Sequence, residues 1–221
     1  AFGNFEAMLS DLQEPLGETI PNFHNMEFRM SQLIEAVEND KFCRIDDPEE
    51  GDGRHPIDND PDHSDEVIAM IDEIDENSIE MCKAEQMFRE GVLPKRICHC
   101  DTKVNNILFD KDGNVLCVID LDTVMPSFIF SDFGDFLRTA ACTAAEDEPD
   151  TSKISFDMEI FKSFAKGYIE SAGGFLTDME KKNLPYAACM FPFMQAVRFL
   201  ADYLNGDVYY KTKYIDHNFV R

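Results

Sequence analysis

A short stretch in the middle of the chain gathers the residue types that phosphoryl transfer needs. Its polar residues are, in order, His99, Asp101, Lys103, Asn106, Asp120 and Asp122. Phosphoryl transfer requires a carboxylate that accepts the proton of the attacking hydroxyl, ligands for magnesium, and positive charge near the migrating group. In the pattern HxDxxxxN, Asp101 would be the base, and Asn106 would place an amide oxygen on the metal. Lys103 stands between them and could approach the transferred group.

Two apolar runs between Asn106 and Asp120 predict a β-hairpin. The runs are NILF and VLCVI, and the segment DKDGN that joins them supplies tight-turn chemistry through Asp112 and Gly113. The hairpin would return Asp120 to a position beside Asn106. Magnesium favours one or two carboxylates together with phosphate oxygens and water, so Asp120 is expected to be its main ligand. The alternative is that these Asp and Asn residues only form turns and helix caps.

Two further features of this region are given supporting roles. A histidine two residues before a base is more often buried and bonded to the backbone than catalytic, so His99 is expected to be a scaffold residue. Asp132, Phe133 and Gly134 spell DFG, but they follow Asp101 by 31 residues and do not follow a hairpin strand. In protein kinases the metal-binding Asp of DFG comes soon after the hairpin, the place that Asp120 occupies here. Asp132 is therefore expected to cap a helix starting near Phe133 and to brace the catalytic loop.

Composition excludes several classes of function. The 221 residues are 44% hydrophobic and include 19 Phe, which is enough for a sizeable core. There are 20 Lys and Arg against 44 Asp and Glu, giving a formal charge of -24. Nucleic acid would meet a repulsive field, whereas a cationic or neutral polar ligand suits it. An anionic ligand would need a local cluster of basic side chains or a metal.

Targeting features also point to one compartment. No run of 18 apolar residues is present, so no membrane partner is expected, and the start of the chain has no secretion signal. The seven cysteines are an odd number without regular spacing. We expect reduced thiols and a cytoplasmic location.

The rest of the chain predicts a mostly helical body. Helical periodicity covers residues 2–12, 26–37, 67–89, 156–172 and 177–205, the last interrupted by Pro185 and Pro192 and opened by a capping box of Thr177 and Glu180. The run RIC at 96–98 predicts a further strand. Residues 44–66 are rich in Asp, Glu, Pro and Gly and predict an exposed acidic loop. Part of this loop imitates an EF-hand but lacks its required Gly and bidentate Glu, so a solvated loop is preferred.

Taken together, the segment HCDTKVNNILFDKDGNVLCVIDLDTVMPSFIFSDFGDFLR resembles the phosphotransferase family of aminoglycoside phosphotransferases, choline kinases and sugar kinases. HxDTKxNN, IDLDTVMP and DFGD look most like the N-acetylhexosamine 1-kinases. The resemblance extends to AFGNFEAML at the start and RFLADYLNGDVYYKTKYIDHN near the end. It implies a protein-kinase-like fold, ATP and Mg²⁺ as cosubstrates, and transfer of the γ-phosphate to the anomeric hydroxyl of GlcNAc or GalNAc.

The resemblance also assigns residues. It implies a base at Asp101, metal ligands at Asn106 and Asp120, and sugar contacts at Arg198 and Tyr209. Asp122 is close enough to Asp120 to serve the sugar or the metal. For Arg198 the alternative is a surface salt bridge, and for Tyr209 it is simple packing.

The implied fold class is α+β, the mostly helical C-terminal lobe of a kinase with a small catalytic hairpin. Residues 1–221 would be this catalytic and substrate lobe, without the N-terminal lobe that clamps the nucleotide. One alternative is an aminoglycoside, choline or ethanolamine kinase, because the acidic surface attracts cations. Another is an inert acidic binding lobe.

Overall fold

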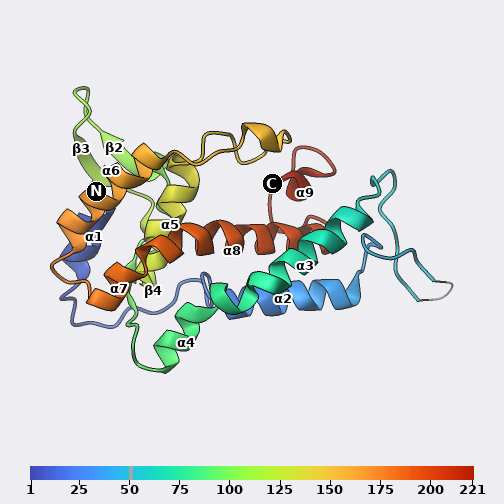
Figure 1. Ribbon diagram of the computed structural model, residues 1–221, viewed down its shortest axis with the longest axis horizontal. Helices are drawn as coiled ribbons and strands as arrows, with labels where there is room; N and C mark the ends of the chain where they lie inside the picture. The colour runs from blue at the N-terminus through green and yellow to red at the C-terminus, as the bar shows by residue number, and fades with distance from the viewer. Residues whose placement is uncertain (50–51) are drawn as a thin grey trace. The chain divides into compact units, whose positions relative to one another are not determined.

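The computed structural model describes residues 1–49 and 52–221 and is a mostly helical α+β fold with two small antiparallel sheets, as the sequence predicted (Figure 1). The chain forms two compact units, which are described separately. The first unit contains Ala1–His24, Ala84–Ala145 and Ser152–Pro192. The second unit contains Asn25–Lys83, Glu146–Thr151 and Phe193–Arg221.

Helices dominate the chain, as predicted. The helices are α1 (Phe2–Leu9), α2 (Met26–Asn39), α3 (Ser64–Met81), α4 (Lys83–Arg89), α5 (Ile129–Ala140), α6 (Met158–Ala172), α7 (Asp178–Lys182), α8 (Leu184–Leu204) and α9 (His217–Val220). The strands are β1 (Arg96–Cys98), β2 (Ile107–Phe109), β3 (Val115–Val118) and β4 (Met125–Ser127). Short 3-10 helices are η1 (Val104–Asn106), η2 (Leu121–Thr123) and η3 (Thr151–Lys153). No helix in the part of the chain that the structure describes is both long and apolar enough to cross a bilayer.

The two sheets place the candidate residues side by side in the first unit. β1 pairs antiparallel with β4, so that Cys98 lies opposite Met125. β2 pairs with β3 in the predicted hairpin, where Ile107 lies opposite Val118. The segment 99–106 therefore runs from the first sheet to the second, and the segment 119–124 runs back. A hydrogen bond of 2.9 Å from the Ile119 N–H to the Asn106 carbonyl joins the two segments.

The hairpin turn uses a different aspartate from the one expected. Gly113 has a φ of +84°, a conformation that suits glycine. The carboxylate that organises the turn belongs to Asp110, which accepts the N–H groups of Asp112 and Asn114. Asp110 stands at the start of the turn, so its short side chain reaches the backbone N–H groups two and four residues further on, as in an Asx turn.

Three helix boundaries differ from the expectation. The helix expected over 67–89 is two helices that meet at Cys82, and α3 begins earlier, at Ser64. Its first turn is polar, with Asp65 and Glu66 favoured by the helix dipole, so apolar periodicity could not reveal it. Pro192 lies inside α8 without ending it. The helical region expected over 177–205 is instead interrupted at Asn183, between α7 and α8. The capping box of Thr177 and Glu180 is confirmed.

The segment 44–66 is only partly the solvated loop that was expected. Its last three residues begin α3, and residues 50 and 51 lie outside the described residues. Arg44 is buried and holds Asp60 and Asp207 in ion pairs of 2.6 and 2.8 Å. Arg44 thus ties Asp60 of this segment to Asp207, which follows α8, and composition alone could not show this link.

The core of the first unit is built around α5. Ile129, Phe130, Phe133 and Leu137 on this helix are fully buried. Phe133 contacts Phe161, Phe164 and Tyr168 of α6 through its ring. Gly134 lets α5 approach α8 closely, because a Cβ there would lie 2.4 Å from the Ala187 carbonyl oxygen and 2.6 Å from the Phe191 Cβ.

Replacing Gly134 with Ala should therefore destabilise the protein despite the better helix propensity of alanine. Both clashing atoms lie on or next to the backbone and cannot move aside, so we expect the free energy of unfolding to fall by about 1–3 kcal/mol. Urea denaturation measures this. Gly174→Ala is the control, because a Cβ there meets nothing within 4 Å. Equal losses in the two variants would contradict the packing argument.

Candidate active site

The structure brings Asp101, Lys103 and Asn106 into direct contact. The Lys103 Nζ lies 2.7 Å from the Asp101 Oδ2. The Asn106 Nδ2 donates to the same Oδ2 at 2.9 Å and to the Asp101 carbonyl at 2.8 Å. These bonds use the amide nitrogen of Asn106 and leave its Oδ1 as the atom that could coordinate a cation. The Asp101 carboxylate is half-exposed and accessible to a hydroxyl.

Asp120 stands where the hairpin returns to this loop. It is exposed and immediately precedes η2, which contains the exposed Asp122. Burial opposes the charge of Lys103, but its hydrogen bond to Asp101 and the charges of Asp101, Asp120 and Asp135 together raise the pKa of its ammonium. Asp120 therefore lies within electrostatic reach of Lys103. An oxygen of Asp120 and the Asn106 Oδ1 are the donor atoms that magnesium prefers.

Two residues beside these groups hold the left-handed backbone conformation. Cys100, directly before Asp101, has a φ of +63°, and Asp120 has a φ of +66°. For residues other than glycine this conformation costs of order 1 kcal/mol and persists only where surrounding contacts enforce it. The contacts that enforce it at Cys100 come from α5.

Asp132 and Asp135 on α5 hold the backbone of the candidate catalytic loop. The Asp132 carboxylate accepts the N–H groups of His99 and Cys100, each at 2.7 Å. Asp135 accepts the Thr102 N–H at 2.8 Å. The Thr102 hydroxyl in turn donates to the Asp132 carbonyl at 2.7 Å. Three backbone N–H groups of the loop, those of His99, Cys100 and Thr102, are thereby bonded to one helix.

Burial governs the charge of both carboxylates. It raises the pKa of Asp132, and the two backbone N–H groups oppose that shift. Burial also raises the pKa of Asp135 to about 6, assisted by the nearby charge of Asp101 and opposed by Arg138. Water does not compete for these buried carboxylates, so their hydrogen bonds to the backbone N–H groups of the loop hold both side chains in one position.

The expectation that Asp132 caps a helix starting near Phe133 was wrong. α5 begins at Ile129, with Phe128 at its N-cap and no side-chain cap, so Asp132 lies in the first turn. The buried side chains of Ile129 and Phe130 start the helix by packing, which makes a polar cap unnecessary. The hydrogen bonds expected between Asp132 and the loop are present.

His99 links the two loops from a buried position. Its Nε2 lies 2.9 Å from the Ile119 carbonyl, so this nitrogen carries the proton, and its own carbonyl accepts the Thr123 hydroxyl at 2.8 Å. Its ring packs edge-on against Phe2 and Phe5 of α1. These polar and aromatic contacts agree with a scaffold residue.

Glu6 is a supporting residue that the sequence analysis missed. It is buried on α1 and its Oε2 accepts the Tyr168 hydroxyl at 2.5 Å. Its carboxyl group lies beside Asp132 and Cys98, with one possible ligand atom from each residue within 4.8 Å of the others. Burial and the charge of Asp132 raise the pKa of Glu6 well above its usual value. This shift favours the protonated form of Glu6 beside Asp132, because two adjacent buried carboxylates resist ionising together.

A signal for Glu6 existed in the sequence. It follows Phe2 by four residues on the apolar face of the first helix, where a carboxyl group must be buried. Figure 1 shows α1 and α6 side by side, which brings Tyr168 to Glu6. Burial also raises the pKa of the Cys98 and Cys100 thiols well above their usual value, which favours their neutral form. All seven cysteines are free, as expected.

Arg198 and Tyr209 belong to the second unit. They line one pocket there, with the Arg198 guanidinium carbon 5.8 Å from the centroid of the Tyr209 ring. Arg198 also donates to the Gln195 Oε1 at 2.7 Å. Tyr209 is two-thirds exposed, so its ring is not simply packed in the core.

Glu6→Gln should reduce the pH dependence of stability. A folded-state pKa above the unfolded one means that folding binds a proton, so the contribution of Glu6 is complete below the ordinary glutamate pKa and is lost as pH rises through the folded one. Glutamine preserves the hydrogen bonds without this loss. As pH rises from 5 to 8, the unfolding free energy of the wild type should fall relative to that of the variant, by up to about 1.4 kcal/mol per pH unit. Parallel pH profiles from denaturant titrations would contradict a protonated Glu6.

One comparison with known proteins bears on this geometry. The model of the phosphotransferase enzyme family (APH) matches residues 16–158. This span is well over half of the chain and contains the candidate catalytic loop, the hairpin and α5. A match over this much of the chain shows that the chain belongs to the phosphotransferase enzyme family.

Proposed function

We propose that this chain is the catalytic and substrate-binding lobe of an ATP- and Mg²⁺-dependent kinase that phosphorylates the anomeric hydroxyl of an N-acetylhexosamine, GlcNAc or GalNAc. The observation that carries the proposal is the cluster of Asp101, Lys103 and Asn106 beside the returning hairpin in a phosphotransferase-family chain. The segments DTK and DTVMP favour the hexosamine among the substrates of such enzymes.

Asp101 has the geometry of the base. Its carboxylate is held by the Asn106 amide and would accept the proton when the anomeric oxygen attacks the γ-phosphorus. The O–H bond of the sugar breaks, an O–P bond forms, and the bond to ADP breaks. An anomeric hydroxyl is more acidic than an ordinary alcohol, so an aspartate without unusual basicity suffices.

The other candidate residues would take the following roles. Lys103, 2.7 Å from Asp101, would offset negative charge as the phosphoryl group moves. When bound, Mg²⁺ would neutralise the nucleotide phosphates, and Asn106 and Asp120 would hold it. Asp122 would contact the sugar or the metal, and Arg198 and Tyr209 would contact the sugar ring. Arg supplies a fork of donors, and Tyr an apolar face with a polar tip.

The runner-up is a kinase of a cationic alcohol, such as an aminoglycoside, choline or ethanolamine. The formal charge of -24 would attract these substrates. The pocket that contains Arg198 argues against them, because its lining includes Arg29, Lys41 and Arg198. A cationic substrate would require carboxylates in their place.

Asp101→Asn should lower kcat by about 10²–10⁴-fold, because asparagine cannot accept the proton. Nucleotide affinity should stay near that of the wild type. Steady-state kinetics and nucleotide titration on the full-length protein measure the two effects. Asp112→Asn, in the exposed hairpin turn, is the matched control for loss of one nearby negative charge. Near wild-type kcat in Asp101→Asn would remove Asp101 from this role.

The acceptor is tested directly by offering GlcNAc, GalNAc, choline and kanamycin to the full-length protein with ATP and Mg²⁺. Phosphorus NMR of the product should show a phosphate on the anomeric carbon of a hexosamine. If choline or kanamycin is phosphorylated and both hexosamines are ignored, the cationic-substrate alternative replaces this proposal.

A further inference from the structure

A pocket of about 380 Å³ lies in the second unit, between α2, α8 and the segment that follows α8. Three of its lining side chains are cationic, namely Arg29, Lys41 and Arg198. The pocket also has the rings of Tyr209 and Tyr210 on one wall. Three cations in one pocket are notable in a chain that has more than twice as many acidic as basic residues.

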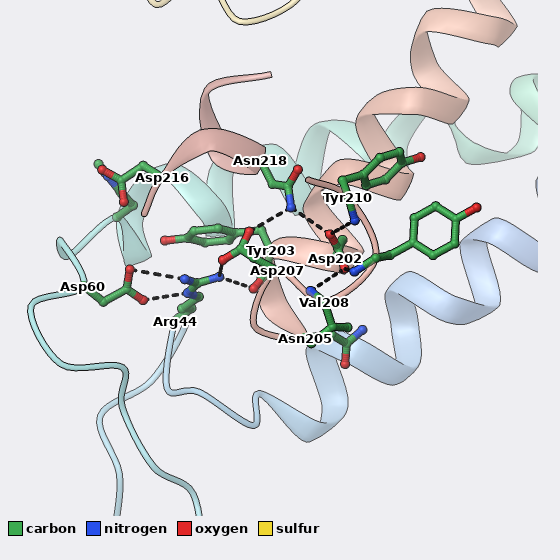
Figure 2. Close-up of polar contacts among 12 residues, drawn as sticks. Arg44, Asp60, Asp202, Tyr203, Asn205, Asp207, Val208, Tyr210, Asp216 and Asn218 are labelled. Carbon is green, nitrogen blue, oxygen red and sulfur yellow. Dashed lines mark hydrogen bonds and ion pairs between the residues drawn. The ribbon is translucent and has the colours of Figure 1, made fainter. Parts of the chain in front are cut away.

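The one carboxylate in the lining is committed to the pocket wall. Asp202 accepts the backbone N–H groups of Val208, Tyr209 and Tyr210 at 3.1, 2.8 and 3.0 Å. It also accepts the Asn218 side-chain amide at 2.7 Å. Figure 2 shows this carboxylate facing the Val208 and Tyr210 backbone and Asn218. Four neutral donors therefore satisfy its two oxygens and fix Asp202 to the tyrosine wall of the pocket.

Another arginine of the second unit, Arg44, is buried and paired with carboxylates. These belong to Asp60 and Asp207, and the Arg44 guanidinium carbon lies 3.7 Å from the centroid of the Tyr203 ring (Figure 2). Arg29 and Arg198 both have neutral amides among their contacts. The Arg29 Nη1 donates to the Gln32 Oε1 at 2.6 Å, and Arg198 donates to the Gln195 Oε1 at 2.7 Å.

The two arginines act on each other. The pKa of Arg29 is lowered to about 10, first by burial and then by the positive charge of Arg198. Arg198 lies over the rings of both Tyr209 and Tyr210, at 5.8 and 5.5 Å from their centroids. An anion placed between the two guanidinium groups would relieve their repulsion and could accept a fork of hydrogen bonds from each.

We propose that the Arg29–Arg198 end of this pocket binds an anionic group, a carboxylate or a phosphate ester, carried on the sugar ring of the ligand. Tyr209 and Tyr210 would face the ring. Lys41 follows Arg29 by 12 residues, which corresponds to more than 15 Å along α2 and its end, so it serves the opposite end of the pocket. The inference deepens the proposed function and rests on it for the sugar.

Binding to the full chain without ATP or Mg²⁺ tests this separately from catalysis. Isothermal titration compares GlcNAc 6-phosphate with GlcNAc, and glucuronate with glucose, so that each pair differs only in the anionic group. At least one anionic sugar should bind ten times more tightly than its neutral partner in 20 mM NaCl, and the preference should shrink in 500 mM NaCl. The two pairs distinguish a phosphate ester from a carboxylate.

Variants assign the preference to the arginines. Arg29→Gln should remove most of it while changing GlcNAc binding less than threefold, and Arg29→Lys should retain part of it. Lys182→Gln, an exposed charge in the last turn of α7, is the control for loss of one positive charge and should keep the full preference. If Arg29→Gln does not fold, the salt dependence of the wild type's preference for the anionic sugar decides the question.

Equal affinities for the anionic and the neutral sugar in both pairs would overturn the inference. So would an equal preference for the anionic sugar in Arg29→Gln and in the control Lys182→Gln. Inorganic phosphate that binds as tightly as GlcNAc 6-phosphate would overturn its sugar part. Phosphorylation of GlcNAc without any anionic preference leaves the proposed function standing and this inference refuted. A preference for anionic sugars without phosphorylation of any sugar would support this inference and refute the proposed function.

Discussion

The candidate active site depends on one buried interaction, the two backbone hydrogen bonds that the Asp132 carboxylate accepts from His99 and Cys100. Cys100 is held in a left-handed conformation that it would not adopt unaided, and Asp101 follows it directly. The direction in which the Asp101 carboxylate points is therefore set from α5. Because Asp132 is fully buried, no water can substitute for it if it is lost.

The four residues of the DFGD string act together as one structural unit. Asp132 and Asp135 face the loop, Phe133 packs against α6, and Gly134 admits α8 at close range. Tight packing on the far side of α5 makes the helix a rigid mount for its two carboxylates. Glu6 and Tyr168 extend the same polar network to α1 and α6, and burial together with the charge of Asp132 raises the pKa of Glu6 within it.

The sequence predicted the elements whose local chemistry is complete within a few residues. The hairpin was visible from two apolar runs and an Asp-Gly turn, and α7 from the capping box of Thr177 and Glu180. β4 was not predicted, because three residues that include Pro126 carry no strand pattern without their partner β1. Likewise, the motif spacing indicated Asp101 and Asn106, whereas Glu6 and Asp135 act through tertiary contacts between distant segments. The partners of Arg44 were hidden for the same reason, since an acidic loop offers many carboxylates of equal appearance.

The most direct test of this account is amide hydrogen exchange of Asp132→Asn compared with the wild type. An asparagine side chain offers one acceptor and one donor, so one of the two loop N–H groups would face a donor instead of an acceptor. The account predicts faster exchange in the peptide that covers residues 98–106, unchanged exchange in the hairpin at 107–118, lower thermal stability and preserved magnesium-nucleotide binding. Unchanged protection of residues 98–106, together with loss of metal binding at full stability, would show that Asp132 is a metal ligand and would contradict the account.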